Sequence, residues 1–269
     1  MARQVRHERD KHPLVLTFRS AFSAVSDNRK QISMTSTALL LIGLAVFIAS
    51  FAQGCSGMGF AMLSAPIVTL FAPELVPVML LVLMIPLNAY IGWRERSAID
   101  WRGVKLITLG RFAGTFLGLW ILLLVNLQQL ALLIGWSTLI AAAVALLSPA
   151  FALGKRGLGL VGLVTGVTET ATGVGGPPLA LAYQHQRAAV LRSTVAICFL
   201  LGEIISLIVL AIGGKVDADT LLISLQMLPF LMLGSYASTF VHQRLDGPLL
   251  RYLVLGFSSL SGIVVILQA

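Results

Sequence analysis

Long apolar runs separated by short polar segments dominate this chain. From Thr37 the runs follow one another to the C-terminus, and only 11% of the 269 residues are charged, against 57% that are hydrophobic. Soluble globular domains carry roughly 25% charged residues. Because a soluble fold has no place for this much apolar surface, the sequence predicts an all-α polytopic membrane protein whose outer surface meets a lipid bilayer.

The N-terminal segment has a different composition. Residues 1–36 are polar and mixed in charge, and their longest apolar stretch is broken by Arg19, so they lack the layout of a cleavable signal. We therefore expect a polar tail over residues 1–36 and a membrane domain over residues 37–269.

The net charge of +8 is not distributed like a nucleic-acid-binding surface. Lys and Arg lie in the tail and in short segments between apolar runs, as expected where positive loops stay on the cytoplasmic side of a membrane. Nucleic acid is therefore not an expected partner. Cys55 and Cys198 sit in apolar surroundings and match no metal-ligand spacing, so we expect neither a metal nor a cofactor.

One stretch inside the apolar material cannot be a continuous helix. Thr168–Ala180 reads TETATGVGGPPLA, with three glycines and two adjacent prolines. Glycine frees the backbone, and proline removes a hydrogen-bond donor and breaks a helix interior. Within a bilayer, non-helical backbone is tolerated only where protein buries it or a wet cavity adjoins it. The stretch therefore predicts a helix break at a solute-binding site.

The chain repeats itself around this break. Residues 37–150 and 157–269 align when Gly57 is placed on Gly173, which also places Gly59 on Gly175 and Gln53 on Glu169. Matching Gly/Pro-interrupted segments in two halves are typical of secondary transporters and indicate the binding site. We expect two homologous halves, each with an interrupted helical hairpin and three spans.

Loop charges predict how the halves are oriented. Basic residues concentrate in Arg94–Lys105, Lys155–Arg156, Arg187–Arg192 and Arg244–Arg251, whereas Ala72–Pro77, Asn126–Gln129 and Gly213–Asp219 carry few. Placing the basic loops inside makes the second interrupted segment a hairpin that enters and leaves on one side, and inverts the two halves. This scheme puts the basic tail outside. The alternative, in which the first interrupted segment crosses once and the tail is cytoplasmic, stays open.

Four motifs resemble one family of membrane permeases. Ala171–Ala180, Gly54–Phe60, Arg96–Arg102 and Gly213–Asp217 are similar to motifs of the sulfite exporter TauE/SafE family, and the resemblance extends from Thr37 to Leu267. It implies about eight transmembrane helices and the transport of small sulfur-containing or carboxylate anions, such as sulfite or sulfoacetate. Glu169, Glu203 and Arg111 match no part of the family pattern, and the first break lacks the double glycine and the prolines.

Candidate binding residues cluster at the two breaks. Freed amides and a following helix N-terminus present N–H groups and a positive dipole end to an anion, while close helix packing is the alternative use of small residues. Hydroxyls could add donors, unless they bond their own helix backbone. The candidates are Gly173, Gly175, Gly176, Pro177, Thr170, Thr172, Ser56, Gly57 and Gly59.

Three ionisable residues interrupt apolar runs. Glu169 and Glu203 are candidates for coupling transport to a proton or another ion, since an intramembrane carboxyl is costly without a function; for Glu169 the alternative is a paired or neutralised residue near the interface. Arg111 is either a counter-charge for the anion or a side chain that extends back to the membrane surface. Pro86 and Asn88 suggest a kink or a polar lining position.

The combined hypothesis is a secondary transporter of small anions working by alternating access in the cell (inner or plasma) membrane, with H⁺ as the expected coupling ion. No Walker-type phosphate loop occurs, so ATP is not expected to drive it directly. An intramembrane enzyme and an anion channel are the alternatives. The sequence leaves open whether the chain forms a homodimer.

Overall fold

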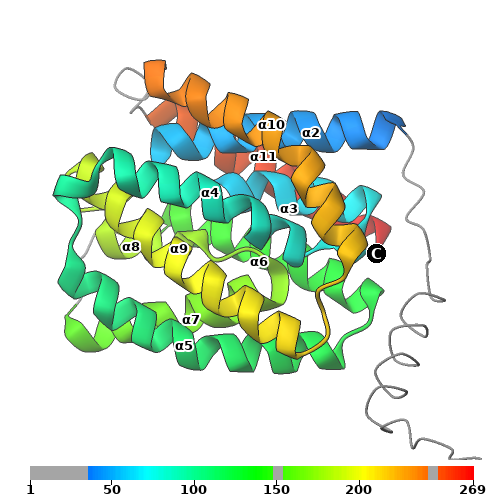
Figure 1. The fold of residues 1–269 in the computed structure, drawn as a ribbon, viewed down its shortest axis with the longest axis horizontal. Coiled ribbons are helices and arrows are strands. Elements are labelled where there is room, and N and C mark those ends of the chain that lie inside the picture. Colours follow the sequence, from blue (N-terminus) through cyan, green and yellow to red (C-terminus); the bar gives the residue numbers. More distant parts are fainter. Residues whose placement is uncertain (1–35, 148–153, 242–247) are drawn as a thin grey trace, which may run out of the picture. The chain divides into compact units, whose positions relative to one another are not determined.

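The computed structural model describes residues 36–147, 154–241 and 248–269. Nearly all of the polar tail predicted for residues 1–36 lies outside these ranges. Within them the regular structure is helical, without a strand (Figure 1). The all-α prediction therefore holds for the described part of the chain.

The helices fall where the sequence predicts apolar runs. Those of the first half are α2 (Ser36–Ser56), α3 (Phe60–Phe71), α4 (Val78–Arg94), α5 (Trp101–Leu124) and α6 (Leu127–Leu147), with short 3₁₀ turns η1 (Pro73–Leu75) and η2 (Arg96–Ala98). Those of the second half are α7 (Lys155–Thr172), α8 (Gly176–Tyr183), α9 (Ala188–Ile212), α10 (Ala218–Val241) and α11 (Pro248–Gln268).

Many of these helices are suited to a bilayer. Among the described residues, α2, α5, α6, α9 and α10 are long and apolar enough to cross a membrane, and α3, α4 and residues 252–268 of α11 form shorter apolar helices. Large apolar side chains such as Leu109, Trp120 and Phe240 remain exposed on their outer faces. A surface of this kind indicates a multi-pass membrane protein.

The loops gather at two ends of the helix bundle. At one, which we call the basic end, Arg192 Nε donates to Glu95 Oε1 at 2.9 Å, and the Tyr183 hydroxyl donates to Asp100 Oδ2 at 2.8 Å. At the other, the opposite end, Val76, Asn126 and Lys215 line one groove of about 680 Å³. The structure thus groups the described loops as their charges predict, while residues 244–247 of the basic segment Arg244–Arg251 lie outside the described residues.

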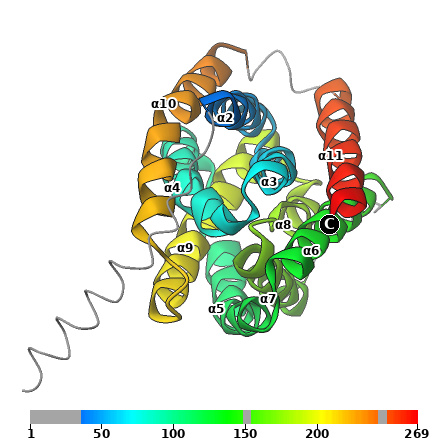
Figure 2. The same cartoon turned by 90° about the vertical axis from the view of Figure 1, so that its right-hand side faces the viewer.

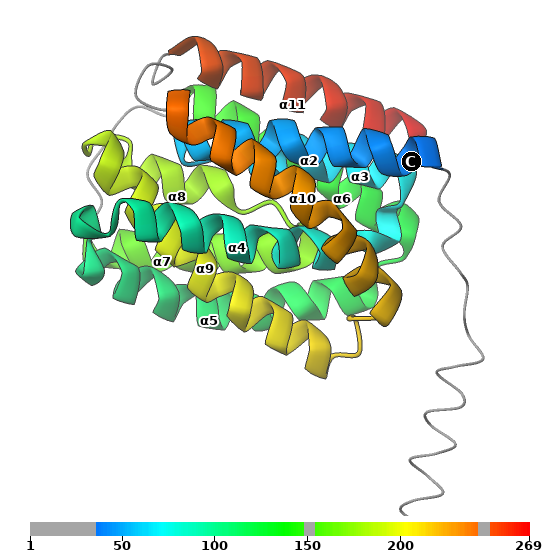
Figure 3. The same cartoon turned by 45° about the horizontal axis from the view of Figure 1, so that its top comes forward.

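Helices pair across the two halves of the sequence. Helix α7 runs beside α5 in the same direction: a Cβ on Gly110 would meet the carbonyl of Gly159, and one on Gly118 that of Val167. Helix α2 lies beside α10 in the same way, α4 packs on α9, and α6 packs on α11 (Figures 2 and 3). Glycine contact with a neighbouring backbone is typical of membrane helix pairs.

Both interrupted segments form hairpins. Helix α7 starts at the basic end, and α8 returns there, because Tyr183 reaches Asp100. The predicted second hairpin is therefore present. Helix α2 runs parallel to α10, which starts at the opposite end, and α3 leads back to η1 beside the groove at that end. The first interrupted segment is thus also a hairpin, entered from the opposite end.

Candidate functional site

The two helix breaks share a backbone geometry at their first glycine. Gly57 (φ 82°) and Gly173 (φ 75°) both adopt the left-handed conformation that favours glycine. Each amide donates four residues back at 2.7 Å, from Gly57 to the Gln53 carbonyl and from Gly173 to the Glu169 carbonyl. The predicted alignment therefore holds for this pair of glycines. The second aligned pair, Gly59 (φ 114°) and Gly175 (φ −125°), differs in backbone conformation.

Hydroxyls close both breaks in the same way. The amide of Met58 donates to Ser56 Oγ and the amide of Val174 donates to Thr172 Oγ1, each at 3.3 Å. Ser56 and Thr172 also bond backbone carbonyls of their own segments. These two predicted donors thus serve their own helix ends in this state, while Thr170 Oγ1 bonds Ser206 Oγ of α9 at 2.8 Å.

The second break lies against a buried carboxylate. A Cβ placed on Gly175 would stand 2.8 Å from Glu169 Oε2 and 3.0 Å from Thr165 Cγ2. Gly176, the first residue of α8, is buried, yet a Cβ there would meet no surrounding atom within 4 Å. Pro177 occupies the first turn of α8, a position that needs no intrahelical donor. The start of α8 thus combines unfilled space with a nearby charge.

Glu169 forms an ion pair with Arg111 of α5, through Oε2 and Nη2. Both side chains are fully buried. Arg111 Nη1 also donates to the Cys198 carbonyl at 3.1 Å, and its guanidinium lies 5.5 Å from the Phe199 ring centroid. Arg111 therefore does not extend to the membrane surface, and Glu169 is paired in the interior.

Glycines on two helices make room for this pair. A Cβ on Gly166 would lie 2.6 Å from the Arg111 carbonyl oxygen, so α7 approaches α5 closely at the arginine. Gly202 of α9 lies directly against the guanidinium, where any side chain would overlap it. The sequence signal for the pair is this set of glycines near the charged residues.

A second buried network joins both halves. Asn88 Nδ2 donates to Glu203 Oε1 at 2.6 Å, and Gln53 Nε2 donates to Asn88 Oδ1 at 2.8 Å. Gln53 Oε1 in turn accepts from the amide of Phe60 at 3.0 Å. Asn88, predicted to mark a kink or a polar lining position, is fully buried within this network. Sequence reasoning missed Gln53, although it is an amide in an apolar run and aligns with Glu169.

Several polar atoms in this interior have no hydrogen-bond partner among the described residues. They are Arg111 Nε, Glu169 Oε1, Glu203 Oε2, Thr115 Oγ1 and Thr165 Oγ1. Because buried polar groups are normally satisfied, the cluster can accept further hydrogen bonds, from water or from a bound solute. One guanidinium stands here with two carboxyl groups, which we call the ionic cluster (Arg111, Glu169 and Glu203).

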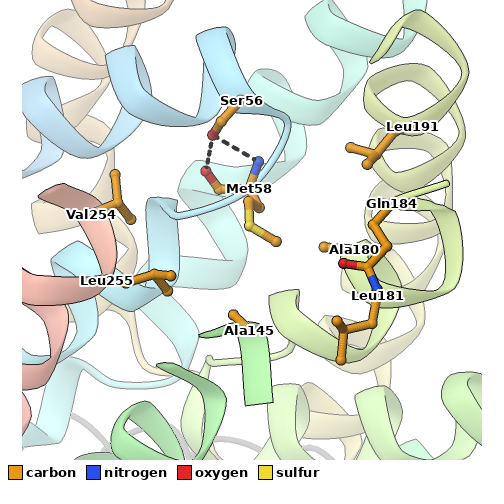
Figure 4. A pocket seen from close by; sticks show the side chains of 9 residues that line it. All are labelled: Ser56, Met58, Ala145, Ala180, Leu181, Gln184, Leu191, Val254 and Leu255. Carbon is orange, nitrogen blue, oxygen red and sulfur yellow. Dashed lines mark hydrogen bonds between the residues drawn. The ribbon is translucent and has the colours of Figure 1, made fainter. Parts of the chain in front are cut away.

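A cavity of about 180 Å³ opens at the basic end (Figure 4). Ser56 and Met58 of the first break line one side, and Ala180 and Leu181 of α8 line another (Figure 4). We call it the basic-end cavity. The structure therefore brings the first break and α8 to one cavity, but Gly173, Gly175 and the ionic cluster do not line it.

These observations define a multi-pass membrane protein with two broken helical hairpins and a buried ionic cluster. The sequence matches the model of the family described as "Sulfite exporter TauE/SafE" over residues 40–265. The chain belongs to this family, and it is a membrane transporter of the sulfite-exporter type. Comparisons with curated proteins and with solved structures gave no match.

Proposed function

We propose that the protein is a secondary transporter of small anions in the cell (inner) membrane, built from inverted halves. Each half contributes one broken hairpin and three spans, which makes eight membrane segments. The hairpin α2–α3 is entered from the opposite end and α7–α8 from the basic end, and each lies beside a helix of the other half. This packing of each hairpin against the other half supports the inverted arrangement. Transporters with such repeats bind solutes where the halves meet.

The observation that carries the proposed site is the Arg111–Glu169 pair beside the start of α8. A small anion would bind the N–H groups at Gly175 and Gly176 and take the place of Glu169 on the guanidinium. Arginine suits this role because its planar fork of donors matches sulfonate and carboxylate oxygens. Thr165, whose hydroxyl is unpartnered, adds a donor within the same buried region.

Charge balance supports H⁺ as the coupling ion. With both carboxyl groups ionised, the ionic cluster carries one positive and two negative charges, and a bound anion adds a third negative charge. An unbalanced buried charge costs several kcal/mol. A proton taken up by Glu169 or Glu203 together with the anion offsets that charge, so anion and proton would move together.

The two cavities support alternating access. The basic-end cavity and the groove at the opposite end are both bounded by loops or helix breaks, and neither is lined by Arg111, Glu169 or Glu203. The structure corresponds to a state in which the ionic cluster is closed off from both. Rocking of one half against the other would connect the cluster to each cavity in turn.

A flux assay tests this proposal. Full-length protein in vesicles is offered labelled sulfite, sulfoacetate, thiosulfate and small carboxylates at two pH values. We expect saturable flux of at least one anion that an imposed proton gradient accelerates. Flux proportional to concentration with no response to the gradient would indicate a channel instead, and chemical conversion of the solute in the vesicles would indicate an enzyme.

Gly175→Leu tests the site itself. The added side chain would overlap Glu169 and Thr165, so flux should be lost while the protein still inserts and purifies. The matched control is Gly159→Leu in α7 of the same hairpin, because Gly159 has no positive φ and a Cβ there meets no described atom within 4 Å. Equal flux in the two variants would contradict the assignment of the site.

A further inference from the structure

The second network ends on the wall of the basic-end cavity. Gln53 and the amide of Phe60 flank the first break on both sides, and Ser56 and Met58 lie between them in the sequence. The Gln53 side chain therefore bridges the two helices of the first hairpin across its break. In the second half Glu169 aligns with Gln53, but its carboxylate binds Arg111 of α5.

The donors and acceptors of this network fix its direction. The Phe60 amide is a donor only, so it orients Gln53 with its oxygen toward the break and its nitrogen toward Asn88. Asn88 must then offer its oxygen to Gln53 and its nitrogen to Glu203. In every hydrogen bond the donor lies on the side of the α3 N-terminus and the acceptor on the side of the Glu203 carboxyl group. Links aligned in one direction polarise one another, so a change at one end alters the strength of the others.

The carboxyl group of Glu203 sets the strength of the last link. Hydrogen bonds to an ionised acceptor are roughly twice as strong as neutral ones. The other charged groups that act on Glu203 are Arg111 of α5 and Glu169 of α7, both in the ionic cluster. Asn88, from α4, is the neutral partner. A change of charge in the cluster therefore reaches the first hairpin through two amide side chains.

We propose that Gln53 and Asn88 are positioning residues that couple the charge of Glu203 to the first helix break. With Glu203 ionised, the hydrogen bonds through Asn88 and Gln53 hold Ser56 and Met58 in place in the wall of the basic-end cavity. When Glu203 loses its charge, these hydrogen bonds weaken, and Ser56 and Met58 become more exposed to the cavity. The proposal builds on the proposed function, in which Glu169 or Glu203 exchanges a proton. It takes Glu203 as that carboxyl group and identifies the residues through which the exchange would control access to the cavity.

The test measures exposure of the wall and needs no substrate. Met58→Cys is introduced into the full-length protein, and its reaction rate with a water-soluble maleimide is measured in detergent. Cys55 and Cys198 are fully buried and stay in place, and the parent protein gives their background rate. Met58 and Leu181 are both partly exposed in the same cavity, so Leu181→Cys is the matched reporter on the wall formed by α8.

Each variant is combined with each reporter. Asn88→Ala removes two hydrogen bonds, the one from Gln53 and the one to Glu203. It should raise the rate at Met58→Cys by about fivefold or more, since one lost hydrogen bond is worth about fivefold. Glu203→Gln keeps the acceptor but removes the charge, and should give a smaller rise. Glu203→Ala removes both the acceptor and the charge, so its labelling rate should rise about as much as that of Asn88→Ala. The rate at Leu181→Cys should stay constant in all of them.

Two results would overturn the proposal. If Glu203→Gln, which preserves size and hydrogen bonding, reacts at the parent rate while Asn88→Ala is faster, the link is structural and carries no charge signal. If both reporters accelerate together, the variants loosen the whole bundle. Failure of the flux assay alone would contradict the proposed anion transport and leave this labelling pattern unchanged, so the two failures are distinguishable.

Discussion

Arg111 combines three contacts that no other residue type can reproduce. Its two terminal nitrogens serve different partners, the Glu169 carboxylate and the Cys198 carbonyl, while its planar face lies over Phe199. Lysine has the charge but lacks the fork and the flat face. The arginine is therefore fixed in one orientation, with its remaining nitrogen Nε unpartnered within the described part of the chain.

Arg111→Lys should consequently separate stability from transport. The charge that balances Glu169 remains, so the variant should fold, but the anion would lose its bidentate partner, and the ratio of maximal flux to half-saturating concentration should fall by about tenfold or more. Arg111→Gln leaves Glu169 without a buried cation and should cost about 3–5 kcal/mol of stability. The measurements are anion flux in vesicles and thermal unfolding in detergent. Full flux with lysine would rule out guanidinium recognition of the anion.

At the scale of elements, the α5–α7 pair places the ionic cluster. Glycines along α7 let its backbone touch that of α5, and this contact sets Arg111 of one helix beside Glu169 of the other. A Cβ on Gly162 would lie 2.9 Å from the Ile107 carbonyl carbon, which is backbone and cannot rotate away. Separation of the two helices would therefore displace the ion pair.

Gly162→Ala should lower stability by about 1–3 kcal/mol, the usual range for an overpacked interface. It should also reduce flux, because the Arg111–Glu169 pair would be displaced. Gly159→Ala is the control, three residues earlier on the same helix, because a Cβ there would meet nothing within 4 Å. Thermal unfolding of both variants in detergent, followed by flux, checks the prediction. Equal unfolding temperatures would show that the α5–α7 contact is loose at this point.

Much of this arrangement can be predicted from the sequence, and the part that cannot has a physical reason. Gly57 and Gly173 reveal the two breaks because their residue type is demanded by local backbone geometry. Glu169, Glu203 and Arg111 stand out because charge is rare in apolar runs. Which of them meet is a property of helix packing over long separations, and no local pattern specifies it. Gln53 was overlooked because a neutral amide gives a weaker signal than a charge.

At the scale of the whole molecule, the basic-end cavity lies between parts of both halves. Its walls come from the break after α2, from α8, from the start of α9 and from α11, with Ala145 at the end of α6. Ser56 and Met58 belong to the first half, whereas Leu181 and Leu191 belong to the second. In the proposed alternating access, rocking of the halves would therefore change the width of this cavity.

A link across the cavity should stop transport. In a protein with both Met58→Cys and Leu181→Cys, a short bifunctional thiol reagent with a cleavable disulfide would join the two walls. Flux should be lost on linking and recover after reduction, because the chemistry of the ionic cluster is untouched. Each single-cysteine protein, treated identically, should keep its flux. If the linked protein still transports at the rate of the single variants, the two walls do not move apart, and the solute passes without a change in the width of this cavity.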